Sequence, residues 1–235
     1  MKRTLVTLLL GSLLFVACKK DAAKTAEDPC FLQTANPSGR SYTPDSIIAI
    51  TYLQKHCGFM PLSRASYWVY EDSFFNEGIF EKVQFDTLRF ENTYQSLSDQ
   101  LIWWEPSLSV GLPDLLYAND SAIFVAGYRL FATDPIRDAK KEYSFFEGDS
   151  IKYITSFEDN AAMGRSVKIN NSLHTPAGHF DNCILFEKKS PYFRKDQVFF
   201  KPGLGVIKYT SEQATMGSLV LKMKQVSTLV NFYLH

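Results

Sequence analysis

The chain has 235 residues, of which 46% are hydrophobic and 14% aromatic, and its 25 basic residues balance its 25 acidic residues. Residues 1–17 hold two of the basic residues and no acidic one, so the rest has 25 − 2 = 23 basic against 25 acidic residues, a net charge of −2. This balance, without any cluster of Lys and Arg, argues against nucleic acid as a partner.

The first 17 residues have the features of an export signal: Lys2-Arg3, then an apolar run from Leu5 to Leu14. The run is shorter than the roughly 20 residues that a transmembrane helix needs. Leu14-Phe15-Val16-Ala17-Cys18 follows and resembles a bacterial lipobox, in which the cysteine becomes the acylated first residue. We therefore expect a lipoprotein signal peptide at 1–17 and a lipid anchor at Cys18, the alternative being an ordinary signal peptide.

Residues 18–42 are expected to form a flexible tether, because small and polar residues dominate there and few large apolar ones occur. Thr43-Pro44-Asp45 carries helix-start signals, and apolar residues then follow at roughly helical spacing. The sequence thus predicts a short helix from Pro44 to His56, although its β-branched residues also suit a strand.

Residues 43–235 are predicted to form one mainly β domain, an antiparallel sandwich or a partly open barrel with that short N-terminal helix. Apolar and polar residues alternate from Met60 onward, and Tyr67–Phe75 and Ile79–Phe90 flank a loop of hairpin length. Further strands are expected at Leu101–Trp104, Ala122–Val125, Tyr128–Phe131, Ile151–Phe157, Leu219–Lys224 and Val230–Leu234.

Two turns rich in Pro and Gly lie in the last third of the chain. The first contains Thr175-Pro176-Ala177-Gly178 and the second Pro202-Gly203-Leu204-Gly205. Together they form the pattern TPAGxFxNC followed by PGxGxxK, and Tyr67–Ser73 reads YWVYEDS. This combination, spanning Met60 to Tyr209, resembles a domain of Bacteroidetes-type lipoproteins. The resemblance implies an antiparallel β architecture and implies no catalytic residues.

If Cys18 is acylated, three cysteines remain, and only one pair can form among them. Exported proteins live in compartments that permit disulfides. We expect Cys30 to pair with Cys57, which would tie the tether to the start of the domain. Cys183 lies within a predicted strand and is expected to be a small buried residue.

Two groups of residues are candidates for ligand binding. His174 and His179 flank the first turn, and Asp181 lies on the same side of its strand as His179, so the three could hold zinc. The alternative is a pair of exposed hairpin histidines, and no metal motif supports the site. Trp103 and Trp104 could stack on a glycan with one ring, or fill the core and cover the sheet.

The expected function is that of a non-enzymatic binding or structural module, lipid-anchored in the cell envelope, with the outer membrane as the expected membrane. No cofactor is expected, and the candidate ligands are an envelope protein, a lipid or a glycan. The alternatives are a carrier of lipid or another apolar ligand in a β half-barrel, and a metal-dependent enzyme using His174, His179 and Asp181. The oligomeric state does not follow from the sequence.

Overall fold

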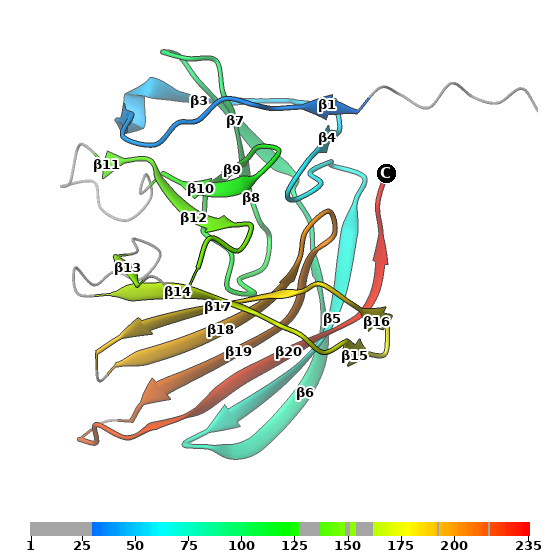
Figure 1. Ribbon diagram of the computed structural model, residues 1–235, viewed down its shortest axis with the longest axis vertical. Coiled ribbons are helices and arrows are strands. Elements are labelled where there is room, and N and C mark those ends of the chain that lie inside the picture. Colours follow the sequence, from blue (N-terminus) through cyan, green and yellow to red (C-terminus); the bar gives the residue numbers. More distant parts are fainter. Residues whose placement is uncertain (1–29, 127–136, 149–150, 154–161, 192, 216) are drawn as a thin grey trace, which may run out of the picture.

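The computed structural model describes residues 30–126, 137–148, 151–153, 162–191, 193–215 and 217–235 (Figure 1). The predicted signal peptide, Cys18 and the strand predicted at Tyr128–Phe131 lie outside these residues, as does most of the strand predicted at Ile151–Phe157. No helix in the described ranges is long and apolar enough to cross a membrane.

Two large open sheets contain most of the strand residues in the described chain, and all their pairings are antiparallel. The six-stranded sheet has the order β12 (Lys140–Ser144), β10 (Ala122–Val125), β9 (Leu116–Ala118), β8 (Ile102–Glu105), β7 (Asn92–Ser96) and β3 (Ile47–Ile50). The eight-stranded sheet has the order β13 (Lys152–Tyr153), β14 (Met163–Lys168), β17 (Ile184–Ser190), β18 (Arg194–Lys201), β19 (Gly205–Ala214), β20 (Leu221–Tyr233), β5 (Tyr67–Asn76) and β6 (Ile79–Leu88).

Three small two-stranded sheets complete the described structure. They pair β1 (Phe31–Leu32) with β4 (His56–Cys57), β2 (Ser41–Tyr42) with β11 (Arg137–Asp138), and β15 (Leu173–Thr175) with β16 (Gly178–Phe180). The mainly β, antiparallel class predicted from the sequence is confirmed, and neither large sheet closes into a barrel.

The eight-stranded sheet is assembled from two distant parts of the chain. The hairpin β5–β6 follows the predicted bounds closely, and the C-terminal strand β20 pairs with β5, so the end of the chain completes the sheet (Figure 1). The two separate strands predicted after Leu219 are one strand, β20. The six-stranded sheet comes mostly from the chain between β6 and β13.

The main core lies between the two large sheets. Apolar side chains of β8, β9 and β10 pack there against those of the eight-stranded sheet. Tyr143 of β12 stacks on Phe186 of β17 with ring centroids 4.5 Å apart, which joins the two sheets directly. Buried members of this core include Trp68, Tyr70, Leu88, Trp104, Leu116, Ile123, Ile184, Val198, Phe200 and Val206.

A second core covers the other face of the six-stranded sheet, and the chain from Gln33 to Ile47 helps to build it. Tyr42 contacts Trp103 edge to face at 5.2 Å, and Arg40 forms a 2.7 Å ion pair with Asp99. The described part of the predicted tether, residues 30–42, is therefore packed against the domain. Its few large side chains pack on one face of the six-stranded sheet.

The helix predicted from Pro44 to His56 is absent. The helix-start signals produce one 3-10 turn, η1 (Pro44–Ser46), and the chain then enters strand β3. The isoleucines of this segment are β-branched and suit a strand. Pairing of β3 with β7 supplies backbone hydrogen bonds that an isolated short helix would have to provide alone.

Candidate functional site

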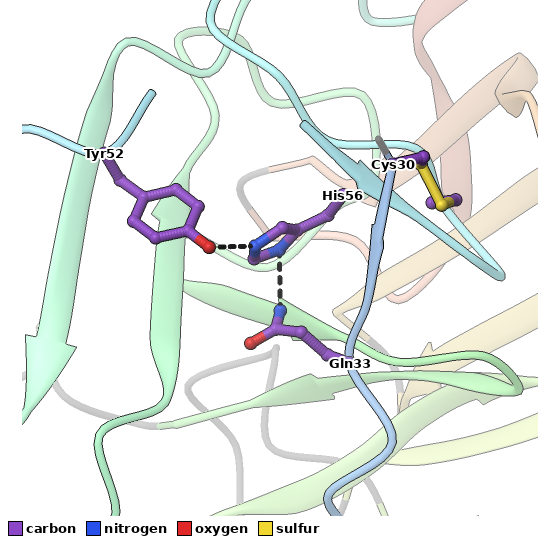
Figure 2. Close-up of a disulfide and its surroundings, with 5 residues drawn as sticks. Cys30, Gln33, Tyr52 and His56 are labelled. Atoms are coloured by element: carbon purple, nitrogen blue, oxygen red, sulfur yellow. Dashed lines mark hydrogen bonds between the residues drawn. A yellow bond between two sulfur atoms is a disulfide. The ribbon is translucent and has the colours of Figure 1, made fainter. Parts of the chain in front are cut away.

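A disulfide beside a buried histidine links Cys30 to the domain (Figure 2). Cys30 and Cys57 are joined, with their Cα atoms 5.8 Å apart, and Phe31 and Leu32 pair with His56 and Cys57 as short parallel strands. The structure therefore joins Cys30 and Cys57, the pair expected from the sequence. The bond ties Cys30 to the short strand β4.

His56 is buried and uses both ring nitrogens (Figure 2). Gln33 Nε2 also donates to the carbonyl of Ala118, so it acts as donor to His56 Nδ1 at 2.7 Å. His56 Nε2 therefore carries the proton and donates to the Tyr52 hydroxyl at 2.9 Å. Burial lowers the pKa of His56 to about 4, so the ring is neutral at pH 7.

A polar row crosses the inner face of the eight-stranded sheet, the face that packs on the main core. It starts where the apolar core residues of each strand end, and neighbouring strands hold its members in register. We call this set the polar row, and it comprises Lys188, Asp196, Tyr209, Ser211, Gln225, Ser227, Asp72, Gln84 and Asp86. Its central members, Lys188, Asp196, Tyr209, Ser211, Ser227 and Asp72, are buried.

Asp196, at the centre of the polar row, has a full set of donors. Arg194 donates to both carboxylate oxygens, at 3.0 and 2.8 Å, and Tyr209 and Ser211 donate at 3.0 and 2.8 Å. Burial, together with the charge of Asp196, raises the pKa of Tyr209 to about 12, so Tyr209 stays protonated and donates. The arrangement neutralises a buried charge and leaves no lone pair directed at a ligand.

Lys188 connects the polar row to the segment between the two large sheets, residues 110–112. Its Nζ donates to the Gly111 carbonyl at 2.7 Å and lies 3.5 Å from Glu142 Oε1, and the Tyr143 hydroxyl donates to the same carbonyl. Burial lowers the pKa of Lys188, while Glu142 and Asp196 act in the opposite direction. Gly111 itself packs on Val198 and Tyr209.

Asp72 is the least satisfied member of the polar row. It is fully buried, and neither carboxylate oxygen has a hydrogen-bond partner of normal geometry in the part of the chain that the structure describes. Burial, together with nearby Asp86, raises the pKa of Asp72 to about 6, although Ser227 and Gln225 act in the opposite direction. Raised acid pKa values mark functional sites as well as strained interiors, so Asp72 is the position to test.

The structure brings two of the three predicted metal ligands together. His174 and His179 face each other across the β15–β16 hairpin, with ring centroids 4.1 Å apart, and both are exposed. Asp181 is instead bound by the Ser172 hydroxyl. Among the residues with described positions, no group of three His, Cys, Asp or Glu side chains could hold a metal ion.

Glycan stacking on the tryptophans of β8 is wrong, because both indoles are fully buried. Trp104 lies in the main core and Trp103 in the second core, since the six-stranded sheet is covered on both faces. Cys183 is a buried free thiol, as expected, and burial raises its pKa.

Sequence reasoning did not find the polar row or the role of His56. One signal was present: Asp72 continues the buried phase of Trp68 and Tyr70, and Lys188 continues that of Ile184 and Phe186. A charged residue in the inward phase of a strand indicates a buried polar contact. The pairing that joins β20 to β5, and so assembles the row, has no local signal.

Comparison with known proteins gives two distant structural neighbours. No family model and no curated protein matches the chain. A crystal structure described as an exported protein with a YmcC-like fold, from Bacteroides fragilis NCTC 9343, has a TM-score of 0.36 and 13% identity, and the match covers 75% of this chain and 99% of that one. A crystal structure described as a lipoprotein, from Parabacteroides distasonis ATCC 8503, has a TM-score of 0.35 and 11% identity, with the same coverage. Both neighbours are too distant to assign a function to this chain.

Proposed function

We propose that the chain is a lipid-anchored protein of the cell envelope that acts as a binding or structural module without enzymatic activity. The observation that carries this proposal is the disulfide between Cys30 and Cys57, which requires an oxidising compartment to persist. It lies 30 − 18 = 12 residues after the lipobox cysteine. Twelve extended residues span at most about 43 Å, so acylated Cys18 would hold the domain close to the bilayer.

The interior chemistry supports a role without catalysis. Asp196 has all its acceptor sites filled by Arg194, Tyr209 and Ser211, and Lys188 is held between Glu142 and the Gly111 carbonyl. His56, the buried histidine, is engaged on both ring nitrogens. None of these groups combines a free functional atom with access for a substrate. The exposed pair His174 and His179 has no third ligand among the described side chains.

An apolar-ligand carrier has less support from this geometry. The inner face of the eight-stranded sheet, where such a ligand would lie, is filled by aromatic core residues and by Val110, Gly111 and Leu112. Beyond them the face continues as the polar row, which does not suit an acyl chain. We therefore place the working surface of the module on its exterior, and the outer membrane is the membrane we propose for it.

Replacement of the lipobox cysteine tests the anchor. In cells that export the full chain, Cys18→Ala should move the protein from the membrane fraction to the soluble fraction after a carbonate wash. Cys183→Ala is the matched control, since it removes a buried thiol and leaves the anchor intact. Retention of the Cys18→Ala protein on membranes would overturn the anchor.

A further inference from the structure

Strand β6 (Ile79–Leu88) is an edge of the eight-stranded sheet, and it pairs only with β5 within the described parts of the chain. Every side chain from Ile79 to Val83 is exposed, and Phe85 is 65% exposed. In Figure 1 the Ile79 end of β6 lies at the opposite end of the molecule from the six-stranded sheet. A long exposed edge strand with apolar side chains is a template for pairing with another strand.

The part of this edge that is both regular and open is short and well defined. Glu81 lies at the register shift between β5 and β6, so regular pairing starts at Lys82. Ser107 donates its hydroxyl to the Thr87 carbonyl at 3.2 Å, and the Arg89 amide donates to the same hydroxyl, so the chain beyond Asp86 is occupied. The open stretch therefore runs from Lys82 to Asp86.

A second copy of the chain can extend the sheet through this stretch under a simple geometric condition. A two-fold axis perpendicular to the sheet keeps inner faces together and outer faces together. Directly opposed side chains in an antiparallel pair point to the same side. The two conditions are met only in registers where one residue faces its own counterpart.

The side chains distinguish among these registers. Centring on Lys82 would place two ammonium groups opposite each other, which is destabilising. Centring on Val83 would place Glu81 opposite Phe85. Centring on Phe85 would place Lys82 opposite a residue outside the open stretch.

In the register centred on Gln84, each of the five residues from Lys82 to Asp86 faces a compatible partner. It places Lys82 opposite Asp86 twice on the inner face, and Val83 opposite Phe85 twice on the outer face. Neither Lys82 nor Asp86 forms an ion pair within one copy, among the side chains that the structure describes. We propose that two copies of this chain associate through antiparallel pairing of their β6 strands, centred on Gln84.

Cysteine cross-linking of the full chain in membranes tests both the dimer and its register. Gln84→Cys should give a disulfide-linked dimer on a non-reducing gel after mild oxidation, because the two positions face each other. Lys82→Cys is the matched control on the same face, since its counterpart would lie four residues away, about 13 Å along the strand. The double variant Lys82→Cys/Asp86→Cys should cross-link again.

Two results would overturn the proposal. One is a Gln84→Cys protein that cross-links no more than Lys82→Cys, and the other is a cross-linked band whose mass identifies a different protein. Charge reversal gives a second measurement by sedimentation of the purified full chain in detergent. Lys82→Asp should shift the protein to the monomer, and Lys82→Asp/Asp86→Lys should restore the dimer; a double variant that folds and stays monomeric would also overturn it.

Discussion

Gly111 is the point where the segment between the two large sheets touches the eight-stranded sheet, and replacing it tests that packing. Its φ is +83°, a left-handed conformation, and an added Cβ would lie 2.4 Å from Val198 Cγ2 and 2.9 Å from Tyr209 Cδ2. The backbone conformation alone costs a residue with a side chain roughly 1–2 kcal/mol. Overpacking against two buried side chains costs roughly a further 1–3 kcal/mol. Gly111→Ala should therefore lower the free energy of unfolding by roughly 2–5 kcal/mol.

Gly203 provides a matched control for the backbone part of this loss. Its φ is +78°, and no atom lies within 4 Å of an added Cβ. Gly203→Ala should therefore cost only the roughly 1–2 kcal/mol of the left-handed conformation. The difference between the two variants isolates the overlap with Val198 and Tyr209.

Urea denaturation of both variants, followed by tryptophan fluorescence, measures this difference. The signal is suitable because Trp68, Trp103 and Trp104 are all buried. Equal destabilisation by the two substitutions would refute the close packing of Gly111 on β18 and β19. It would also remove the basis for placing its carbonyl as the acceptor of Lys188.

Three further predictions concern the disulfide and the two buried groups with shifted pKa values. The Cys30–Cys57 bond closes a loop with a sequence separation of 27, so Cys30→Ser should lower the free energy of unfolding by about 3.5 kcal/mol in the loop-entropy model. A non-reducing peptide map of the wild type that lacks this link would contradict the structure. His56 has its pKa lowered to about 4, so the unfolded chain binds the proton more readily. The contribution of His56 to stability should be complete above about pH 6.5 and be lost as the pH drops toward 4, and the difference in thermal melts between the wild type and His56→Gln should show this loss. Asp72 has its pKa raised to about 6, so its carboxylate opposes folding above that pH; Asp72→Asn should raise the melting temperature at pH 8 and leave it unchanged at pH 4, and a lower melting temperature at pH 8 would indicate a stabilising partner for the carboxylate.

The hairpins and the strand class could be predicted because their signals are local. The alternation from Tyr67 to Leu88 and the turn at Pro202–Gly205 each lie within one short stretch of sequence. Gly178 and Gly205 do adopt positive φ, as turn chemistry suggests. The His174–His179 pair was predictable for the same reason, since the hairpin needs only the turn between them.

The errors concern features decided by distant parts of the chain. Pro44–His56 carries helix signals, and pairing of β3 with β7 overrides them. The small residues before Tyr42 suggest a tether, yet a sheet formed later in the sequence gives them a surface to cover. Trp103 and Trp104 point to opposite faces of one strand, and only the presence of two cores decides that both are buried. No local feature of the sequence shows which residues cover each face of a strand.

His56 and Asp72 together make the pH dependence of the wild type a poor guide to its buried groups. Between about pH 4 and pH 6 the free energy of unfolding rises with pH through His56 and falls through Asp72, each by up to about 1.4 kcal/mol per pH unit. The two slopes partly cancel in the wild type, so its profile is flatter than either group alone would give. Glu187, whose pKa stays low despite partial burial because Arg165 and Gln197 bind it, acts equally in every variant and drops out of differences. Relative to the wild type, Asp72→Asn must tilt the profile upward with pH and His56→Gln must tilt it downward, whereas the double variant must return it to the wild-type slope. Only that pattern assigns the cancellation to these two residues.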